Sequence, residues 1–291
     1  MSEPARHGDR YHDPLRRAGA GRAGVAVAAA LRDAARWVLP VECAGCGAWD
    51  VPLCAACAAA FDGGVPARVE AGVPRLDRLD GVAPLPVWAV ARYAGAVRGV
   101  VLAWKDHGRA DLGRLLTRAA ARAGHELAAQ LAGAATGAGP ILVVPVPTTA
   151  HARRRRGADL VDGLAVSVAA GLDAAGVPAR RRRALVVARR RLDQAGLGAR
   201  ARAANAVGSV RVRGTSTLDA LPVLLVDDVV TTGATLGACE AALVRRGALV
   251  LGAVVLAATP EPAHSGTHRT PGAAARRASD GIRYTDRARG G

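Results

Sequence analysis

Short apolar runs alternate with longer mixed stretches through the second half of the chain, and this alternation predicts the architecture. Runs of strand length that are rich in Val, Leu and Ala lie at residues 141–144, 184–188, 223–226 and 249–257. Stretches of helical composition lie at residues 111–130, 158–175 and 236–245. Continuous apolar strands separated by helices indicate a parallel sheet that is covered on both faces. The sequence therefore predicts an α/β fold whose ligands bind beyond the carboxyl ends of the strands.

The two ends of the chain lack this pattern. Residues 1–22 and 260–291 are rich in Gly, Ala, Arg and Pro without periodicity, which predicts disordered tails. Residues 23–40 begin with an apolar run that charged residues interrupt, so an amphipathic helix fits this segment better than a secretory signal peptide. No apolar run approaches the roughly 20 residues that span a bilayer. We therefore expect a cytoplasmic protein without a membrane segment, with its main domain at residues 84–259.

Four of the five cysteines form two Cys-x-x-Cys pairs near the N-terminus, at Cys43, Cys46, Cys54 and Cys57. Each pair can turn two thiolates towards one point, and two pairs supply the four sulfur ligands of a tetrahedral zinc site. Because four protein ligands leave no position for a substrate, the predicted Zn²⁺ is structural. Two disulfides or unligated thiols remain alternatives, and an iron–sulfur cluster fits the spacing less well. The pattern predicts a zinc-ribbon-like module at residues 41–75.

The most informative stretch follows the apolar run 223–226, where the adjacent acids Asp227 and Asp228 precede a turn rich in threonine. The turn consists of Thr231, Thr232, Gly233, Ala234 and Thr235. Because it opens a predicted helix, a phosphate placed there would meet unpaired backbone N–H groups, the positive end of the helix dipole and threonine hydroxyls. Gly233 would permit close approach of the backbone to that phosphate.

Two carboxylates just upstream of such a turn suit the hydroxyls of a ribose or a hydrated Mg²⁺ ion. The alternative is an ordinary helix cap, which explains one of the threonines but not the adjacent acids. The whole string therefore predicts a site for a sugar that carries a terminal phosphate, with its diol facing Asp227 and Asp228.

This string resembles the phosphoribosyl-pyrophosphate (PRPP) motif of type I phosphoribosyltransferases. The resemblance implies that Asp227 and Asp228 hold the ribose hydroxyls and that residues 231–235 wrap the 5′-phosphate. With the four-cysteine ribbon ahead of it, the chain is similar to the ComF (competence protein F) family, which has an N-terminal double zinc ribbon. The implied architecture is a parallel-sheet type I phosphoribosyltransferase fold with a small N-terminal zinc ribbon.

Three further stretches resemble the same family. The stretch from Tyr93 to Arg109 is similar to the segment that precedes the sheet in that family. The stretch from Val144 to Gly157 is similar to the family's first strand and pyrophosphate loop, and the stretch from Gln194 to Asn205 is similar to its mobile-loop segment. The resemblance implies PRPP bound with Mg²⁺, whose phosphates would be contacted by Arg153, Arg156 and Arg202. One motif departs from the family: where the family usually reads Arg-Gly-Phe-Asn-Gln, residues 156–160 read Arg-Gly-Ala-Asp-Leu. The acceptor therefore cannot be read from the family pattern.

The positive charge of the chain concentrates near the predicted site. The formal net charge is +16, and residues 151–213 carry 15 Arg against 4 Asp, a net +11. Pyrophosphate and a 5′-phosphate carry several negative charges, for which Arg offers bidentate donors. A solvated basic surface is the alternative for most of these arginines. Single-stranded DNA is another anion that fits, although residues 151–213 hold no aromatic residue on which bases could stack.

Arginine fills every basic position of the chain except one, Lys105. A single retained lysine indicates a site that needs a compact ammonium group, although a surviving surface lysine is an equal alternative. We predict that Lys105 reaches the phosphate or the acceptor pocket and acts in catalysis with Asp227 and Asp228.

Together these features predict a ComF-like protein that binds PRPP with Mg²⁺ and transfers or senses the phosphoribosyl group. The alternative is a non-catalytic accessory protein of DNA uptake or DNA handling that binds single-stranded DNA. The chain contains neither a G-x-S-x-G nor an H-E-x-x-H motif, which argues against a hydrolase.

Overall fold

The computed structural model of the chain describes residues 41–73, 76, 83–135, 139–148, 159–188, 210–214 and 218–260. Several predicted features lie outside these residues: both tails apart from Pro260, the amphipathic helix at 23–40, and the phosphate-binding candidates Arg153, Arg156 and Arg202.

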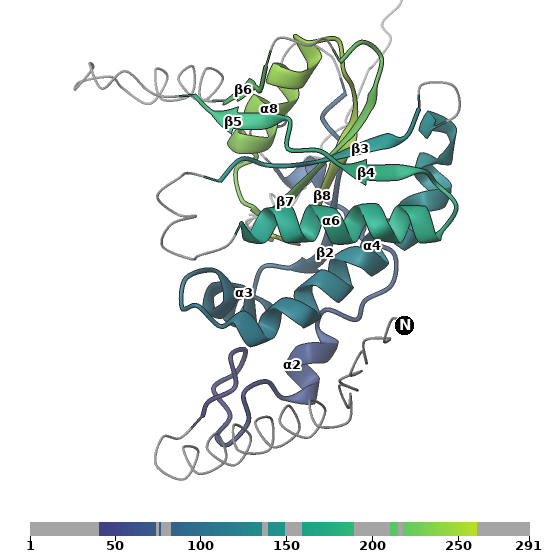
Figure 1. Ribbon diagram of the computed structural model, residues 1–291. Coiled ribbons are helices and arrows are strands. Elements are labelled where there is room, and N and C mark those ends of the chain that lie inside the picture. The colour runs from purple at the N-terminus through teal and green to yellow at the C-terminus, as the bar shows by residue number, and fades with distance from the viewer. Residues whose placement is uncertain are drawn as a thin grey trace, which may run out of the picture. The chain divides into compact units, whose positions relative to one another are not determined.

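A six-stranded sheet in the order β1-β2-β8-β7-β3-β4 forms the centre of the described chain (Figure 1). Its strands are β1 (Ala67–Arg68), β2 (Val87–Arg92), β3 (Ile141–Pro145), β4 (Ala179–Arg181), β7 (Pro222–Val230) and β8 (Leu249–Ala258). All neighbouring strands are parallel except β1, which runs antiparallel to β2. The predicted α/β architecture with a mostly parallel sheet is therefore confirmed.

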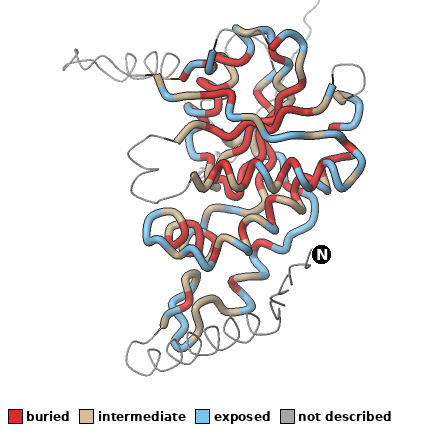
Figure 2. The backbone as a smooth tube through the Cα atoms, in the orientation of Figure 1, coloured by how far each residue is buried: buried red, intermediate tan, exposed pale blue. Residues whose placement is uncertain are grey.

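Helices cover both faces of this sheet, which explains why its central strands are mostly apolar. One face carries α3 (Gly95–Lys105), α4 (Gly113–Ala135) and α6 (Leu160–Ala174), and α8 (Ala234–Val244) packs on the other. All five residues of β3 are buried, and buried positions run through the sheet and the helix sides that face it (Figure 2). Within the described residues, no helix is both long and apolar enough to cross a membrane.

The helices α4 and α6 approach each other closely because glycines lie where their backbones meet. A Cβ atom at Gly124 would overlap the carbonyl of Val168, and one at Gly171 would overlap the carbonyl of Ala121. This close pairing places α6 firmly against the sheet, and the first turn of α6 thereby has a defined position at the carboxyl edge.

One strand pairs differently from the prediction. Residues 184–188 were expected in the parallel sheet, but β5 (Leu185–Val187) pairs antiparallel with β6 (Val210–Val212) in a separate two-stranded ribbon. The place beside β3 belongs instead to β4, whose sequence is Ala-Arg-Arg. An edge strand keeps one side in solvent and needs no apolar run, so the apolar pattern pointed to the wrong segment.

Candidate functional site

The strand β7 carries the two acids of the predicted site within its length. Its parallel pairing with β8 continues through Val229 and Val230, so Asp227 and Asp228 lie in the last half of the strand and not beyond its end. The helix α8 begins at Ala234, after a three-residue turn. The acids and the turn thus lie together at the carboxyl edge of the sheet, as the sequence predicts for a ligand site.

The turn before α8 needs a glycine for two reasons. Gly233, the N-cap residue, has φ +76°, in the left-handed region that residues with a Cβ atom rarely adopt. A Cβ atom at Gly233 would also lie 2.8 Å from Cγ of Leu76 and overlap Cγ1 of Val73, both buried side chains. Packing against Val73 and Leu76 therefore fixes the turn, in addition to any role of Gly233 in binding phosphate.

The turn presents hydroxyl groups and backbone donors to solvent. Thr231, Thr232 and Thr235 are exposed, and among the described contacts no side chain caps the N-terminus of α8. No acidic residue occupies the first turn of this helix. The amide of Ala234 has only a long contact of 3.4 Å to Oγ1 of Thr232. An anion at this position would meet free N–H groups and the positive end of the helix dipole.

The second acid, Asp228, is buried and forms an ion pair with Lys105. The Asp228 residue is 4% exposed, and Nζ of Lys105 lies 2.8 Å from its Oδ1 and 2.7 Å from its Oδ2. The amide of Val229 also donates to Oδ1 at 2.7 Å. Lys105 is the last residue of α3, so the structure brings this predicted residue to the predicted acids across 123 positions of sequence.

The first acid, Asp227, lies in a different environment. It is partly exposed, yet protein atoms surround its carboxyl group closely, and this desolvation raises its pKa from 3.8 to about 8. The charge of Asp228 raises the pKa of Asp227 further. Two groups oppose the shift: the Asp228 amide, which donates to Oδ1 of Asp227 at 2.8 Å, and the positive charge of Lys105. Of the two acids, Asp227 is the one whose oxygens are not already committed to Lys105.

The raised pKa of Asp227 predicts that stability falls as the pH rises. Folded protein keeps this proton up to a pH of about 8, whereas the unfolded chain releases it near 3.8. The free energy of unfolding should therefore decline between about pH 4 and pH 8, by about 2 kcal/mol once the partial solvent access of the group is allowed for. Urea denaturation at several pH values measures this decline, and Asp227→Asn should remove it. An identical pH dependence in Asp227→Asn would contradict the assignment.

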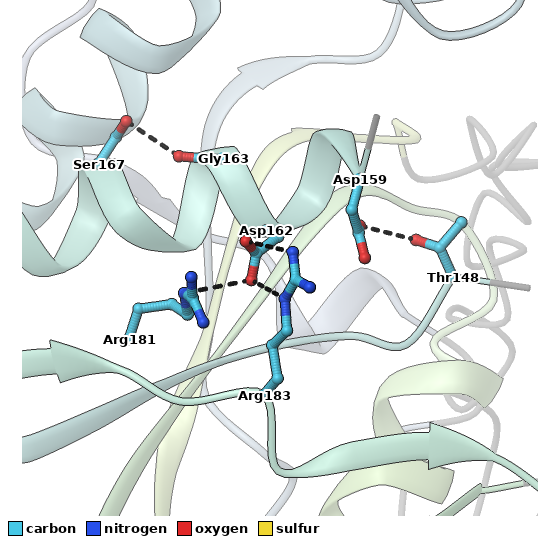
Figure 3. A network of polar contacts seen from close by, with 7 residues as sticks. All are labelled: Thr148, Asp159, Asp162, Gly163, Ser167, Arg181 and Arg183. Atoms are coloured by element: carbon cyan, nitrogen blue, oxygen red, sulfur yellow. Dashed lines mark hydrogen bonds and ion pairs between the residues drawn. The ribbon is translucent and has the colours of Figure 1, made fainter. Parts of the chain in front are cut away.

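The structure adds a polar network that the sequence analysis did not identify (Figure 3). Asp162, in the first turn of α6, is 7% exposed and accepts two hydrogen bonds from Arg183, at 2.8 and 2.7 Å. Arg181 of β4 lies 3.3 Å from the same carboxylate. The hydrogen bonds that Arg183 donates to Asp162 raise the pKa of the Arg183 guanidinium. Asp162 interrupts the apolar run at the start of α6, and that contrast was the signal in the sequence.

A second contact in Figure 3 joins the two sides of the predicted pyrophosphate loop. Thr148, just after β3, donates from Oγ1 to Oδ1 of Asp159, the N-cap residue of α6, at 3.4 Å. The residues between them lie outside the described chain. Asp159 belongs to the stretch that departs from the family pattern, and its carboxylate links the two residues that flank this loop.

The four cysteines predicted as metal ligands lie together. Their sulfur atoms are all within 4.8 Å of one another, and the thiols are free. Sγ of Cys46 lies 3.8 Å from Sγ of Cys54, and two sulfurs of a tetrahedral Zn²⁺ site are also about 3.8 Å apart when each zinc–sulfur bond is about 2.3 Å. Cys43 and Cys57 are each 3% exposed, so the centre of the cluster is shielded. This donor set fits Zn²⁺.

The electrostatics of the thiols agree with a cation at their centre. Burial opposes ionisation of Cys43, but backbone N–H groups of Cys54, Cys46 and Gly45 outweigh it and lower the pKa of Cys43 to about 6. Burial, followed by the neighbouring thiols, raises the pKa of Cys57. Backbone donors thus favour the Cys43 thiolate, whereas ionisation of Cys57 needs a compensating positive charge, which a bound metal would supply.

No family model matches the chain, and no curated protein matches it. Among solved structures, the chain resembles hypoxanthine phosphoribosyltransferase from Staphylococcus aureus, with 19% identity and a TM-score of 0.30 over 48% of this chain and 64% of that chain. It also resembles the Trypanosoma cruzi enzyme, with 18% identity and a TM-score of 0.33 over 52% and 67% of the two chains. The match thus spans less than two thirds of the Staphylococcus enzyme. Identities at this level leave the function to be inferred from the site itself.

Proposed function

We propose that this chain binds PRPP with Mg²⁺ and transfers or senses its phosphoribosyl group, as a ComF-like phosphoribosyltransferase of the cytoplasm. The observation that carries the proposal is the placement of the acids Asp227 and Asp228 and the exposed threonines of the turn at one carboxyl edge of a parallel sheet. That edge is where α/β sheets bind ligands, and the chemistry of the two groups matches a phosphorylated sugar.

Each part of the site would take one part of the ligand. The 5′-phosphate would accept hydrogen bonds from the hydroxyls of Thr231, Thr232 and Thr235 and from the first amides of α8. The ribose hydroxyls would donate to Asp227, whose oxygens, unlike those of Asp228, are not paired with Lys105. Asp228 would act mainly by holding Lys105, since both of its oxygens contact that ammonium group. Arg153, Arg156 and Arg202 remain the predicted contacts of the pyrophosphate.

Phosphoribosyl transfer would displace pyrophosphate from the ribose by the attack of an acceptor. Positive charge develops on the sugar and negative charge on the leaving group, so the protein acts by positioning and by stabilising charge. Because the pKa of Asp227 is raised to about 8, binding of Mg²⁺ beside it would have to displace its proton, after which its carboxylate oxygens would suit Mg²⁺. Mg²⁺ bound with PRPP would neutralise part of the pyrophosphate charge. The Lys105 ammonium, 32% exposed, would add a fixed positive charge beside the acids.

The cysteine cluster would hold a structural Zn²⁺ through all four sulfurs. Four filled positions leave none for a substrate or a water, so this metal would stabilise the module and not take part in the transfer. Reduced thiols, which the cluster requires, are the rule in the cytoplasm.

Calorimetric titration of the protein with PRPP and Mg²⁺ tests the proposal. Asp227→Asn and Thr235→Ala should each weaken binding about tenfold, because the first replaces one accepting carboxyl oxygen by an amide N–H and the second removes a hydroxyl that would donate to the phosphate. Asp173→Asn, which changes an exposed acid at the far end of α6, is the matched control and should bind as the parent does.

The titration also separates the enzyme from its alternative. A parent protein that does not bind PRPP would overturn the proposal. Salt-dependent binding of single-stranded DNA that Asp227→Asn leaves unchanged would instead support a non-catalytic accessory protein, drawing on the basic segment 151–213. An acceptor screen that follows pyrophosphate release would then distinguish transfer from sensing.

A further inference from the structure

The cysteine module contacts the segment that carries Lys105 on both sides of that residue. Before Lys105, a Cβ atom at Gly99 of α3 would lie 2.7 Å from the carbonyl oxygens of both Ala44 and Gly45, so the helix backbone rests directly on the first Cys-x-x-Cys pair. After Lys105, Nη2 of Arg109 donates to the carbonyl oxygen of Pro52 at 3.0 Å. Pro52 lies between the two Cys-x-x-Cys pairs.

Further hydrogen bonds orient the Arg109 guanidinium group that contacts Pro52. Arg109 also donates to the two carboxylate oxygens of Asp111, at 2.9 and 2.7 Å, so its guanidinium group is fixed while it reaches the module. The amide of Arg109 donates to the carbonyl oxygen of Ala103 at 3.1 Å, which ties the turn back onto α3. Lys105 therefore lies on a short segment that the module holds at two points.

Gly45 connects this support to the metal cluster itself. A Cβ atom at Gly45 would lie 2.7 Å from Sγ of Cys57 and 3.3 Å from Cβ of Ala96 in α3. Gly45 is thus packed between a predicted metal ligand and the helix. Any change in the positions of the four sulfurs would be transmitted to α3 because there is no free space between them.

The middle of the same segment, at Lys105, reaches the proposed ligand site. Nζ of Lys105 makes two short contacts with Asp228, at 2.8 and 2.7 Å. Contacts of this length weaken when either group moves by a fraction of an ångström. The position of α3 therefore decides whether Lys105 and Asp228 remain paired.

We propose that the metal-loaded cysteine module is a positioning element for Lys105. Metal held by the four cysteines keeps Gly99 and Arg109 in place, and these residues set the pairing of Lys105 with Asp228. The consequence for the ligand rests on the proposed function: PRPP should bind more weakly when the metal is removed. Because binding linkage is reciprocal, PRPP should also slow the loss of metal to a chelator.

The single lysine of the chain makes a direct test possible. Protein grown with lysine labelled by ¹³C at Cε gives one side-chain NMR signal, which reports on Lys105 without any ligand. Removal of metal with a chelator should move this signal towards that of free lysine and raise the acylation rate of Lys105 several-fold. A signal and an acylation rate that do not respond to metal removal would overturn the proposal.

Two arginine variants keep the test valid even where chelation unfolds the module. Arg109→Gln should retain the metal and still move the Lys105 signal, since it removes the support after Lys105. Arg122→Gln is the matched control: Arg122 of α4 also donates to a backbone carbonyl of the module, that of Phe61, but does not flank Lys105. Equal shifts of the Lys105 signal in both variants would contradict a specific role of the segment at 99–109.

Titration with PRPP and Mg²⁺ completes the experiment and separates the two proposals. If the parent does not bind PRPP, the proposed function fails, whereas the NMR signal still decides whether the module positions Lys105. If the parent binds, Arg109→Gln should weaken binding by about threefold to tenfold, as coupled neighbouring groups do. Unchanged affinity in Arg109→Gln would overturn the link between the module and the ligand site.

Discussion

Replacement of Lys105 by methionine should lower the free energy of unfolding by about 3 kcal/mol, because it leaves the Asp228 carboxylate buried without its partner. The Asp228 side chain is 5% exposed and cannot recover solvation from water. Methionine keeps most of the apolar length of lysine, so the loss reflects the charge and not a cavity. Urea denaturation at pH 7 gives the free energy directly.

Two further variants identify the buried charge as the cause. Asp228→Asn combined with Lys105→Met removes both charges and should recover a large part of the loss, since the remaining amide is neutral. Arg122→Met breaks the more exposed pair with Asp62 and the hydrogen bond to the Phe61 carbonyl, and should still cost clearly less than Lys105→Met because no buried charge is left unpaired. If the double variant were no more stable than Lys105→Met alone, the ion pair would not be what holds Lys105 in place.

The sequence identified Lys105 by composition but could not identify its partner. Its retention among arginines marked it as unusual, whereas the pairing with Asp228 joins α3 to β7 across 123 positions. No local pattern predicts such a contact, because it depends on how α3 packs over the carboxyl edge of the sheet. The same applies to the support by the cysteine module, which depends on Gly99 and Gly45 as points of close approach.

The central strands could be predicted, but the edge strands could not. Burial on both faces gives β3, β8 and the first half of β7 continuous apolar runs, and such runs are visible in a sequence. The strands β4 and β6 are short and carry exposed arginines, so their patterns do not differ from those of loops. Neither the composition nor the hydrophobic periodicity of the sequence predicted that β5 and β6 pair as an antiparallel ribbon.

The two adjacent acids show why a motif alone does not assign roles. Successive residues of a strand point to opposite faces, so Asp227 and Asp228 meet different surroundings although they are neighbours in sequence. Asp228 meets Lys105 and stays paired, whereas close protein atoms raise the pKa of Asp227 to about 8. Asp228 therefore holds the Lys105 ammonium group, whereas the oxygens of Asp227 are not paired with Lys105.

Removal of the metal ligand Cys57 should abolish metal binding and unfold the cysteine module locally. Cys57→Ser should reduce the metal content from about one ion per chain to none, because structural zinc needs all four ligands. The module has little apolar core of its own, and structural zinc in comparable small domains contributes about 10–16 kcal/mol of apparent binding free energy. Folding of residues 41–61 should therefore depend on the metal.

Hydrogen exchange followed by mass spectrometry measures this loss residue by residue. Two backbone amides should lose protection in Cys57→Ser. The Cys54 amide donates to Sγ of Cys43, and the Gly47 amide donates to the Cys43 carbonyl oxygen. Cys239→Ala is the matched control, because Cys239 is fully buried in α8 and lies outside the cluster. It should keep one metal ion per chain and full protection of the module. Protection that persists in Cys57→Ser would mean that packing against α3, and not the metal, holds the module together.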